Sequence, residues 1–552
     1  MKFYSAYMED PYLNVNDSQC LILDFDPFDP RLLQYLETSK PIQCGETQPY
    51  LTYLDANGYI HFNRTTLIFY GKEERDYDCS YADVKRTNKS DFEFILGVPQ
   101  VFTETERVDS SGFILVRCYS RSKKLIYETG HYYVPPPPKN LFSVSKRSID
   151  GDISHPSILI FGLDSMSRLN FIRQLPRTFN YLSNILGAII FKGMCKVGSN
   201  TYPNMIPFLS GRSVHSIDGK NNTVFGDGSI YYDNIPFAWY NFSAKGYVTL
   251  YTEDQPFVDQ RGDKGFLNSP TDYYLRPYWL AMLSINNFRS KDYNCFGNTP
   301  KHLYHIDYTE KFAARMNNHR YFAYSFFSNL SHDDLNLVQV ADADFEGMLF
   351  RMKNKGLLNN TILMFMGDHG KLYHEYRKYD IGRVEERMPF LAVVLPEKFK
   401  RKPLPKDRTC EDAGIPDDYC ICARETKLSN NDTRVKRAAI DLVIYINTVL
   451  LGKTIRQGLC APLQLSSILS AYLVSLGPKA AKPEGFRVMY RVVIEVSPSK
   501  GQFEGTIELD AWREKGRVIG DVNRLNIYGQ QSHCIADKLL RFYCYCADLV
   551  TS

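Results

Sequence analysis

Two apolar segments of this 552-residue chain end on side chains that often bind metal ions in proteins. Ser157–Leu163 is followed directly by Asp164. Thr361–Met366 is followed by the sequence Gly-Asp-His-Gly, which contains Asp368 and His369. Short, uninterrupted apolar runs are typical of strands buried on both faces of a parallel sheet, and open parallel sheets bind ligands at the carboxyl ends of their strands. The two segments therefore predict an α/β fold with a ligand site at this edge of the sheet.

Residues 154–465 alternate short apolar runs with longer helical stretches. This pattern predicts further strands at Ala188–Phe191, Tyr247–Tyr251, Tyr321–Phe327 and Phe390–Leu395. It also predicts helices such as Ala341–Lys355 and Val435–Leu451, each of which is followed by a glycine. Alternating strands and helices build a parallel sheet with crossover helices. We therefore expect a doubly wound, mainly parallel sheet in this part of the chain, and take it as the catalytic domain.

The two ends of the chain have a different pattern. Residues 1–133 mix short alternating apolar segments with turn signals and cysteines, which predicts a Cys-containing, β-rich N-terminal module. Residues 134–153 begin with Val-Pro-Pro-Pro-Pro, which can only be extended, so we expect a Pro-rich linker. Residues 466–552 contain a predicted hairpin of Arg487–Val496 and Gln502–Leu509, which indicates a small β-rich C-terminal module.

The charge balance argues against a nucleic-acid partner. The chain has 66 basic and 62 acidic side chains, a formal net charge of +4. A chain so close to neutral attracts nucleic acid only through local clusters, and its most basic run, Lys398–Lys402, is short and followed by a proline. No run reaches the roughly 18 apolar residues of a membrane-spanning helix. We expect no nucleic-acid partner, and membrane contact only through an N-terminal anchor outside this sequence.

Thirteen cysteines favour disulfides over metal binding. The pairs at 420 and 422 and at 544 and 546 have C-x-C spacing, which is too close for a usual zinc knuckle, and no His pair accompanies them. Disulfides persist in secreted proteins and in the lumen of the secretory pathway. The cysteines are Cys20, Cys44, Cys79, Cys118, Cys195, Cys295, Cys410, Cys420, Cys422, Cys460, Cys534, Cys544 and Cys546.

Asn-x-Ser/Thr sequons support the same location, since they are glycan acceptors in exported proteins. They lie at Asn16, Asn63, Asn88, Asn221, Asn241, Asn329, Asn359 and Asn431. Residues 1–10 lack the apolar core of a signal peptide. We therefore expect a secreted or lumenal glycoprotein and a leader or anchor upstream of this sequence.

Thr201 is the third candidate functional residue. It precedes an apolar helix start in the segment Gly198–Arg212. Its hydroxyl has two interpretations: a helix cap, or a metal-activated nucleophile whose transfer intermediate would lie against helix-terminal N–H groups. Asp164 has a similar alternative, since an Asp after a strand can cap the following helix.

Six motifs in a fixed order support the functional interpretation. They are L-D-S-M-S-R (163–168), N-T-Y-P-N-M-I-P-F-L-S-G (200–211), G-Y-V-T-L-Y-T-E-D (246–254), S-H-D-D-L-N (331–336), G-D-H-G (367–370) and E-E-R-M-P-F (385–390). The set closely resembles the sulfatase-like family of secreted animal proteins known as domain of unknown function family 229, in the alkaline phosphatase superfamily. The resemblance runs from about residue 150 to 460, and the Cys-bearing flanks look similar too.

The resemblance implies roles for individual residues. Asp164, Asp368 and His369 match metal ligands of the superfamily, and Thr201 matches its metal-bound nucleophile. His332 matches a region that relatives use for a second metal or for substrate. Further candidates, given by their position alone, are His374 for that same role and Glu253 and Asp254 for support of the site. Where the family motif often has Arg after G-D-H-G, this chain has Lys371, which keeps the charge but not the planar fork.

The nucleophile position favours phosphorus over sulfur chemistry. Sulfatases oxidise a Cys or Ser in a C/S-x-P-S/A-R setting to formylglycine, whereas this chain has Thr201, from which formylglycine cannot form. Thr is the nucleophile of phosphodiesterases and phosphoethanolamine transferases in the superfamily. We therefore expect a hydrolase or transferase acting on a phosphodiester or phosphate ester, with one or two Zn or Mn ions. The alternatives are a phosphoethanolamine-type transferase or sulfatase-like hydrolase acting on glycans, and an inactive module that binds a glycan or lipid.

Overall fold

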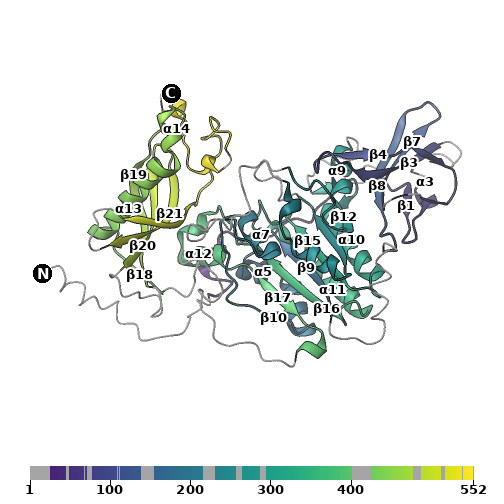
Figure 1. Cartoon of the computed structure of the whole chain (residues 1–552), viewed down its shortest axis with the longest axis horizontal. Helices are drawn as coiled ribbons and strands as arrows, with labels where there is room; N and C mark the ends of the chain where they lie inside the picture. The colour runs from purple at the N-terminus through teal and green to yellow at the C-terminus, as the bar shows by residue number, and fades with distance from the viewer. Residues whose placement is uncertain are drawn as a thin grey trace.

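Three β-rich or α/β units follow one another along the long axis of the molecule (Figure 1). The computed structural model describes residues 25–44, 49–67, 69–70, 77–108, 110, 112–137, 155–214, 231–255, 264–285, 294–400, 424–475, 487–510, 516–537 and 539–550. The predicted linker at 134–153 lies outside the described residues from residue 138 onward.

The central unit is built on a seven-stranded sheet with the order β10-β17-β16-β9-β15-β11-β12. Neighbouring strands from β16 to β12 pair in parallel, whereas β17 is antiparallel to both β16 and β10. The mainly parallel sheet and the six predicted strands are confirmed. The bounds are β9 Ser157–Leu163, β10 Ile189–Ile190, β11 Val248–Glu253, β12 Tyr273–Tyr274, β15 Tyr321–Phe327, β16 Thr361–Gly367 and β17 Leu391–Val394.

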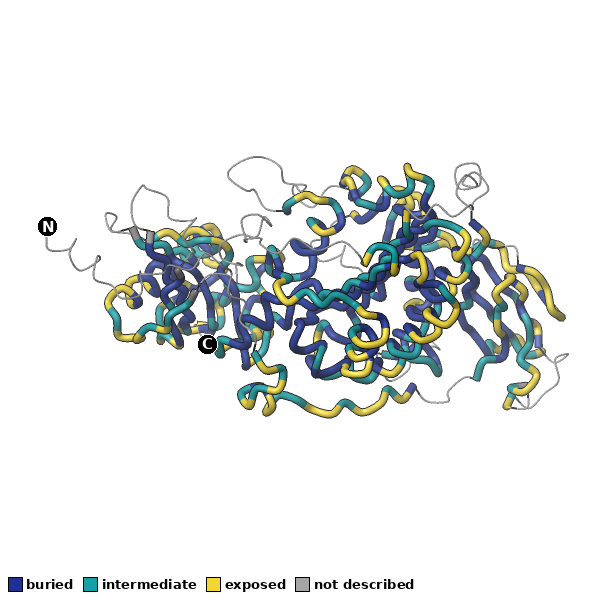
Figure 2. The backbone as a smooth tube through the Cα atoms, turned by 90° about the horizontal axis from the view of Figure 1, so that it is seen from below, coloured by how far each residue is buried: buried dark blue, intermediate teal, exposed yellow. Residues whose placement is uncertain are grey.

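Both faces of this sheet are buried, because alternate residues of β9 enter different hydrophobic clusters. Leu159 and Phe161 pack with one set of helices, and Ile160 packs with another. The first face is covered by α5 (Arg168–Gln174), α6 (Pro176–Asn180), α9 (Arg276–Ser284), α10 (Lys301–Arg315) and α11 (Asp342–Asn354). The second is covered by α7 (Tyr202–Ser210) and α8 (Ala238–Ala244). Buried positions accordingly dominate the middle of the molecule (Figure 2), and the doubly wound fold is confirmed.

The N-terminal unit is β-rich, as predicted. Its larger sheet contains β3 (Tyr77–Arg86), β4 (Phe94–Leu96), β5 (Gln100–Phe102), β7 (Phe113–Ser120) and β8 (Leu125–Tyr132). A smaller sheet contains β1 (Thr52–Leu54), β2 (Tyr59–Phe62) and β6 (Glu106–Arg107), and α3 (Arg64–Leu67) is a short helix. The short helix α2 (Pro30–Leu33) packs on the central unit instead, where Leu32 lies in one cluster with Leu169 and Ile381. Cys79 and Cys118 stand opposite each other on β3 and β7 and form a disulfide. Cys44 is bonded to Cys295 on β13 (Cys295–Phe296), which pairs with β14 (Thr299–Pro300), so the N-terminal segment is tied to the central unit.

The C-terminal unit is a five-stranded antiparallel sheet covered by a helix. Its strands are β18 (Arg424–Lys427), β19 (Gln464–Ser475), β20 (Arg487–Ser497), β21 (Gly501–Asp510) and β22 (Arg517–Arg524). The helix α13 (Thr433–Tyr445) continues through a π-turn at Ile446–Leu450 into α14 (Gly452–Arg456). Val435 and Leu442 of α13 pack with Val492 and Ile494 of β20. Both α13 and β18 precede residue 466, the predicted start of this module, yet they pack with its sheet.

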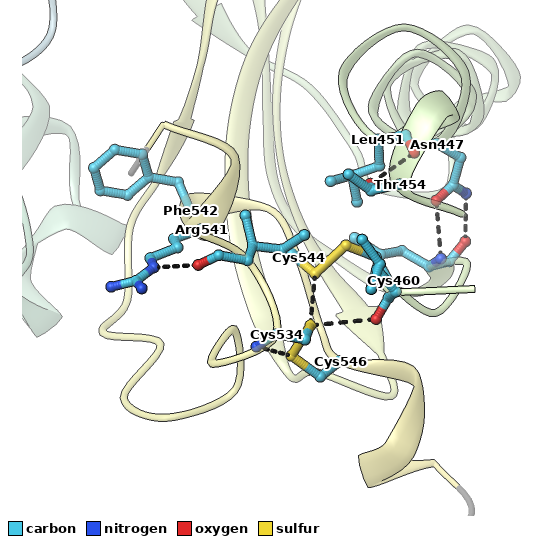
Figure 3. Close-up of a disulfide and its surroundings, with 12 residues drawn as sticks. Asn447, Leu451, Thr454, Cys460, Cys534, Arg541, Phe542, Cys544 and Cys546 are labelled. Atoms are coloured by element: carbon cyan, nitrogen blue, oxygen red, sulfur yellow. Dashed lines mark hydrogen bonds between the residues drawn. A yellow bond between two sulfur atoms is a disulfide. The ribbon is translucent and has the colours of Figure 1, made fainter. Parts of the chain in front are cut away.

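Two disulfides close the end of the C-terminal unit (Figure 3). Cys544 is bonded to Cys460, and Cys546 is bonded to Cys534. The two cysteines of this C-x-C pair therefore belong to different disulfides, and their thiolates are not available to a metal. The prediction of disulfides is confirmed, while Cys20, Cys410, Cys420 and Cys422 lie outside the described residues.

The parallel pairing of β9 and β15 leaves no room for a side chain at Gly162. A Cβ added there would lie 2.2 Å from Cδ2 of Phe326. We expect Gly162→Ala to lower the free energy of unfolding by about 1–3 kcal/mol, since overpacking forces neighbours from their positions. Urea denaturation measures the loss. Gly452→Ala is the matched control, because the nearest atoms to its added Cβ are 3.6 Å away. An equal effect of the two substitutions would contradict the described packing.

Candidate metal centre

Two neighbouring parallel strands bring Asp164 and Asp368 together. β9 and β16 pair in register, with Leu163 opposite Gly367, and each carboxylate follows its strand by one residue. Both side chains are buried, with 1% and 2% of the residue exposed. The backbone N–H groups of Ser165 and His369 donate to Oδ1 of Asp368 at 2.9 and 2.8 Å. This carboxylate is therefore oriented by the backbone of both strand ends.

The glycines that flank the Asp-His pair allow close approach of two backbones. A Cβ at Gly367 would lie 2.1 Å from the carbonyl oxygen of Met166, and one at Gly370 would lie 2.1 Å from that of Glu385. The N–H of Gly367 donates to Phe390 O at 2.8 Å, and that of Gly370 donates to Glu386 O at 2.9 Å. Any larger residue at either position would push the Asp-His pair away from its neighbours.

Thr201 lies beside the two acidic residues and comes from α7, the helix on the second face of the sheet. It lies at the start of α7 with helical dihedral angles, and its side chain makes no capping hydrogen bond. Its buried hydroxyl instead donates to Oδ2 of Asp164 at 3.3 Å and lies 3.5 Å from Nε2 of His369. The capping interpretation of Asp164 is also wrong, since Ser167 caps α5 through a bond from Asn170 N.

The four side chains have the donor set and the spacing of a site for one small divalent ion. Nε2 of His369 lies 3.3 Å from Oδ2 of Asp368 and 3.9 Å from Oδ1 of Asp164. Donors of a tetrahedral zinc site, each about 2.0–2.1 Å from the ion, lie about 3.3 Å apart. Oδ2 of Asp368 accepts no hydrogen bond from the described residues although it is buried. Together these observations show that the residues present fit a divalent cation.

Hydrogen bonding directs a lone pair of His369 toward this cluster. Nδ1 of His369 lies 2.7 Å from the carbonyl oxygen of Gly370, which only accepts. Nδ1 therefore carries the proton, and Nε2 is left with its lone pair. Burial lowers the pKa of His369 to about 4, so the ring is neutral at physiological pH.

The buried carboxylates carry charge that nothing in the immediate cluster neutralises. Burial raises the pKa of Asp368 to about 6. Burial, together with the charge of Asp368, also raises the pKa of Asp164. With a neutral His369 beside them, two ionised carboxylates have an excess of negative charge that a divalent ion would offset.

Asn204 holds the loop that carries Thr201, a role that the sequence analysis missed. Its Oδ1 accepts from the N–H groups of Val197 and Gly198 at 2.7 and 3.1 Å. Its Nδ2 donates to the carbonyl oxygens of Gly198 and Asn200 at 2.8 and 2.7 Å. Asn200 has the left-handed φ of 82°, so the loop turns sharply just before Thr201. The signal available in the sequence was an Asn within an apolar helix start, because Asn has a low helix propensity.

His332 lies near the cluster and is partly exposed. Its side chain is 42% exposed, and Nδ1 lies 2.7 Å from Oδ1 of Asp333. Partial burial acts to lower the pKa of His332, but the charges of Asp164 and Asp333 outweigh it and raise this pKa. Nζ of Lys371 donates to the carbonyl oxygen of His332 and so fixes its backbone. His332 is thus close enough to Asp164 to sense its charge, without belonging to the four-residue cluster.

The other candidates have separate partners. His374 caps the 3₁₀ turn η9 (Glu375–Lys378) through a bond from Tyr376 N, and its ring packs on that of Tyr35. Asp254 joins the ends of β11 and β15, because its oxygens accept from the N–H groups of Ser328 and Asn329. Glu253 lies 3.6 Å from Nη1 of Arg276. The structure does not bring these three side chains into the cluster formed by Asp164, Asp368 and His369.

The described sequons differ in accessibility. Asn63 and Asn329 are half-buried, and Asn329 also bonds Asn294 and Gln255 through its side chain. Asn16 and Asn221 lie outside the described residues. The exposed ones are Asn88, Asn241, Asn359 and Asn431.

None of the helices in the described ranges is long and apolar enough to cross a membrane.

This protein is an α/β protein with a candidate divalent-metal centre. Two carboxylates and an imidazole of the centre follow strands of the doubly wound sheet, and its hydroxyl lies at the start of α7. The chain belongs to the family described as protein of unknown function (DUF229), which matches residues 37–404 and 402–469. The family expected from the six motifs is therefore confirmed. Comparison with the curated proteins finds no match.

Several solved structures are similar to this chain at low sequence identity. The lipoteichoic acid synthase LtaP from Listeria monocytogenes is 11% identical, with 75% of this chain and 98% of that chain covered at a TM-score of 0.34. The putative sulfatase yidJ from Bacteroides fragilis is 11% identical, with 71% and 94% covered at 0.32. Murine ectonucleotide pyrophosphatase/phosphodiesterase 5 is 13% identical, with 40% and 59% covered at 0.27.

The metal-free protein should be destabilised by Asp368. Between its ordinary pKa of 3.8 and its folded pKa of about 6, the folded protein holds a proton that the unfolded chain releases. The free energy of unfolding therefore falls as pH rises through this window and stays lower above it. We expect Asp368→Asn in the presence of a chelator to be more stable than the unsubstituted protein at pH 8, by about 3 kcal/mol at most. The gain should vanish near pH 4.

Urea denaturation at the two pH values measures this difference. Added Zn²⁺ is the internal control, because it should stabilise the unsubstituted protein more than Asp368→Asn and so reduce or reverse the order. A variant that is less stable than the unsubstituted protein at pH 8 with chelator would mean that the carboxylate is stabilised by other groups.

Proposed function

We propose that this protein is a metal-dependent hydrolase or transferase of phosphoric esters in which Thr201 is the nucleophile. The observation that carries the proposal is the hydrogen bond from Thr201 Oγ1 to Asp164 at 3.3 Å, beside Nε2 of His369 at 3.5 Å. A buried threonine at a helix start ordinarily caps the helix. Thr201 does not cap its helix, so its hydroxyl makes no capping bond to the backbone and is directed at the candidate ligands.

The proposed reaction begins with an in-line attack of Thr201 Oγ1 on phosphorus. Asp164 accepts the hydroxyl proton, the ester P–O bond breaks, and the leaving group departs with a proton from solvent or a nearby acid. Asp164, Asp368, His369 and Thr201 would hold a divalent ion, and such an ion would make the Thr201 hydroxyl more acidic and offset charge on the phosphoryl oxygens. The phosphoryl group is then transferred from Thr201 to water or to an acceptor alcohol.

His332 is the proposed contact for the substrate. Its side chain is partly exposed, and its raised pKa keeps more of the imidazolium form near neutral pH. A protonated imidazole can donate to a phosphoryl oxygen or to the leaving oxygen. Lys371 is bonded to the backbone of His332, so its ammonium supports this loop. We assign one ion to the centre, because the described donors that surround it are those of a single cluster.

The secretory pathway is the proposed location of this activity. Four disulfides join described cysteines, and such bonds persist in oxidising compartments. The four exposed sequons are the proposed glycan acceptors: Asn88, Asn241, Asn359 and Asn431. Asn329 is the sequon least suited to a glycan, because its side-chain amide is already bonded within the fold.

Removal of the Thr201 hydroxyl should abolish catalysis. We expect Thr201→Ala to lower kcat/KM for bis-p-nitrophenyl phosphate by about 10³-fold or more, as for other covalent nucleophiles. Thr201→Ser should keep part of the activity. Thr309→Ala is the control, because Thr309 is equally buried but bonds His305 and Ser325 on α10 and β15. Release of p-nitrophenol is the readout, and mass spectrometry after acid quenching should find a p-nitrophenylphosphoryl group on residue 201.

Elemental analysis separates the proposal from a binding module. We expect about one equivalent of Zn or Mn in the purified protein, and loss of activity after chelation that the ion restores. Activity that survives both Thr201→Ala and Asp368→Ala would show that the site is wrongly assigned. Protein that neither contains nor binds an ion would favour an inactive module, and activity only with an added alcohol acceptor would favour a transferase.

A further inference from the structure

The helix α12 (Asp380–Arg387) buries four of its five charged side chains almost completely. Arg383, Glu385, Glu386 and Arg387 have exposed fractions of 8%, 1%, 1% and 2%. Burial of ions is costly unless each has a partner. The helix lies between the central sheet and the C-terminal sheet (Figure 1). Its charges pair with Arg173 and Lys196 of the central unit and with strands of the C-terminal sheet. Such a cluster is expected to hold its partners in one arrangement.

Glu386 contacts both loops that carry residues of the candidate metal centre. Its carboxylate forms an ion pair with Nζ of Lys196, five residues before Thr201, and lies 3.4 Å from Nη2 of Arg377. Its carbonyl oxygen accepts from the N–H of Gly370 at 2.9 Å, next to His369. A single residue is therefore bonded to the loop that carries the nucleophile and to the loop that carries two ligands.

The backbone around Glu386 adds a second link to the nucleophile loop. The N–H of Lys196 donates to the carbonyl oxygen of Arg387 at 3.0 Å. Asn204 then holds Val197 and Gly198, as described above, so the bonded path from α12 to Thr201 has no gap. A shift of α12 would move this path and Gly370 together.

The C-terminal sheet anchors α12 by two carboxylates. Glu504 of β21 accepts from Arg387 at 2.8 Å and from Arg491 of β20 at 3.1 Å. Glu425 of β18 forms an ion pair with Arg383 at 2.6 Å and accepts from Arg491 at 2.8 Å. Two arginines of the helix are thus each held by a strand of the C-terminal unit, and Arg491 joins the two carboxylates.

A separate contact joins the C-terminal unit to the loop after His369. The ring of Tyr373 stacks on that of Phe542, with centroids 6.0 Å apart. Phe542 belongs to the 3₁₀ turn η13 (Leu540–Phe542), just before the disulfide-bonded Cys544. The loop of metal ligands is therefore in contact with the C-terminal unit directly as well as through α12.

We propose that Glu386 is a positioning residue for the metal centre, and that the C-terminal sheet, through Glu504, is a structural part of that centre. Loss of either carboxylate would release α12 and separate the Thr201 loop from the Asp368–His369 loop. The expected change in metal affinity rests on the function proposed above. The expected change in hydrogen exchange of the two loops does not. Residues that support ligands through hydrogen bonds typically change metal affinity by about 10- to 100-fold when substituted.

Glu386→Gln and Glu504→Gln test the proposal, with Glu310→Gln as the matched control. Glu310 of α10 is also buried and also pairs with two cations, Arg351 and Lys355, both at 2.9 Å. Calorimetric titration with Zn²⁺ should give a dissociation constant about tenfold higher or more in the two test variants and unchanged in the control. Hydrogen exchange of the chelated full-length proteins should be faster at 196–205 and at 366–372 in the two test variants only.

The kinetic readout separates positioning from loss of folding. Lower metal occupancy should be rescued by excess Zn²⁺, which would restore much of kcat without changing KM, whereas unfolding would not be rescued. If Glu386→Gln does not fold, Lys196→Met with Glu386→Gln removes both charges. We expect this double variant to fold and to retain the fast exchange of both loops.

Two results would overturn the proposal. One is equal metal affinity and equal exchange in Glu386→Gln, Glu504→Gln and Glu310→Gln. The other is faster exchange in one of the two loops without the other. If the unsubstituted protein binds neither Zn²⁺ nor Mn²⁺, the proposed function fails, while exchange at 196–205 and 366–372 still decides whether Glu386 and the C-terminal sheet position the two loops.

Discussion

The parallel pairing of β9 with β16 is the constraint on which the rest of the site depends. It brings Asp164 and Asp368 to one edge of the sheet and buries both. Two buried carboxylates so close together are unfavourable unless they share a proton or a cation. Backbone hydrogen bonds from Gly367 to Phe390 and from Gly370 to Glu386 hold the end of β16 in place. In this fold, the backbone geometry therefore creates the need for a shared proton or a cation before any ligand is considered.

The strands and the cluster of Asp164, Asp368 and His369 could be predicted because their signals are local. A strand buried on both faces must be an uninterrupted apolar run, and an Asp directly after it must lie at the ligand-binding edge. β9 and β15 have the predicted bounds, and β16 is one residue longer. Thr201 could also be singled out, but its two interpretations could be separated only by the direction of its hydroxyl, which depends on Asp164 and not on the neighbouring sequence.

The supporting charges could not be predicted, because their partners are distant in sequence. The motif E-E-R-M-P-F has the charge density of a solvated helix, yet Glu385 and Glu386 are 1% exposed. Lys196 lies 190 residues from Glu386, and Glu504 lies 117 residues from Arg387. For the same reason the periodicity of α13 predicted a helix but not the sheet it covers. An apolar stripe fits either sheet, and only the packing of Leu442 against the C-terminal strands decides.

The choice of threonine follows from the same need for fixed geometry. The β-methyl group of Thr restricts rotation about χ1 far more than the single hydrogen of Ser does. Thr201 has helical dihedral angles, and Asn204 holds its loop. Its hydroxyl donates to Asp164, so both the position and the orientation of Oγ1 are fixed. Preorganisation of this kind lowers the entropic cost of reaching the reactive geometry. The buried ion pairs of α12 limit the remaining freedom, which is the relative position of the two loops. In the proposed reaction, the hydroxyl of Thr201 can act only if Asp368 and His369 on the other loop stay within its reach.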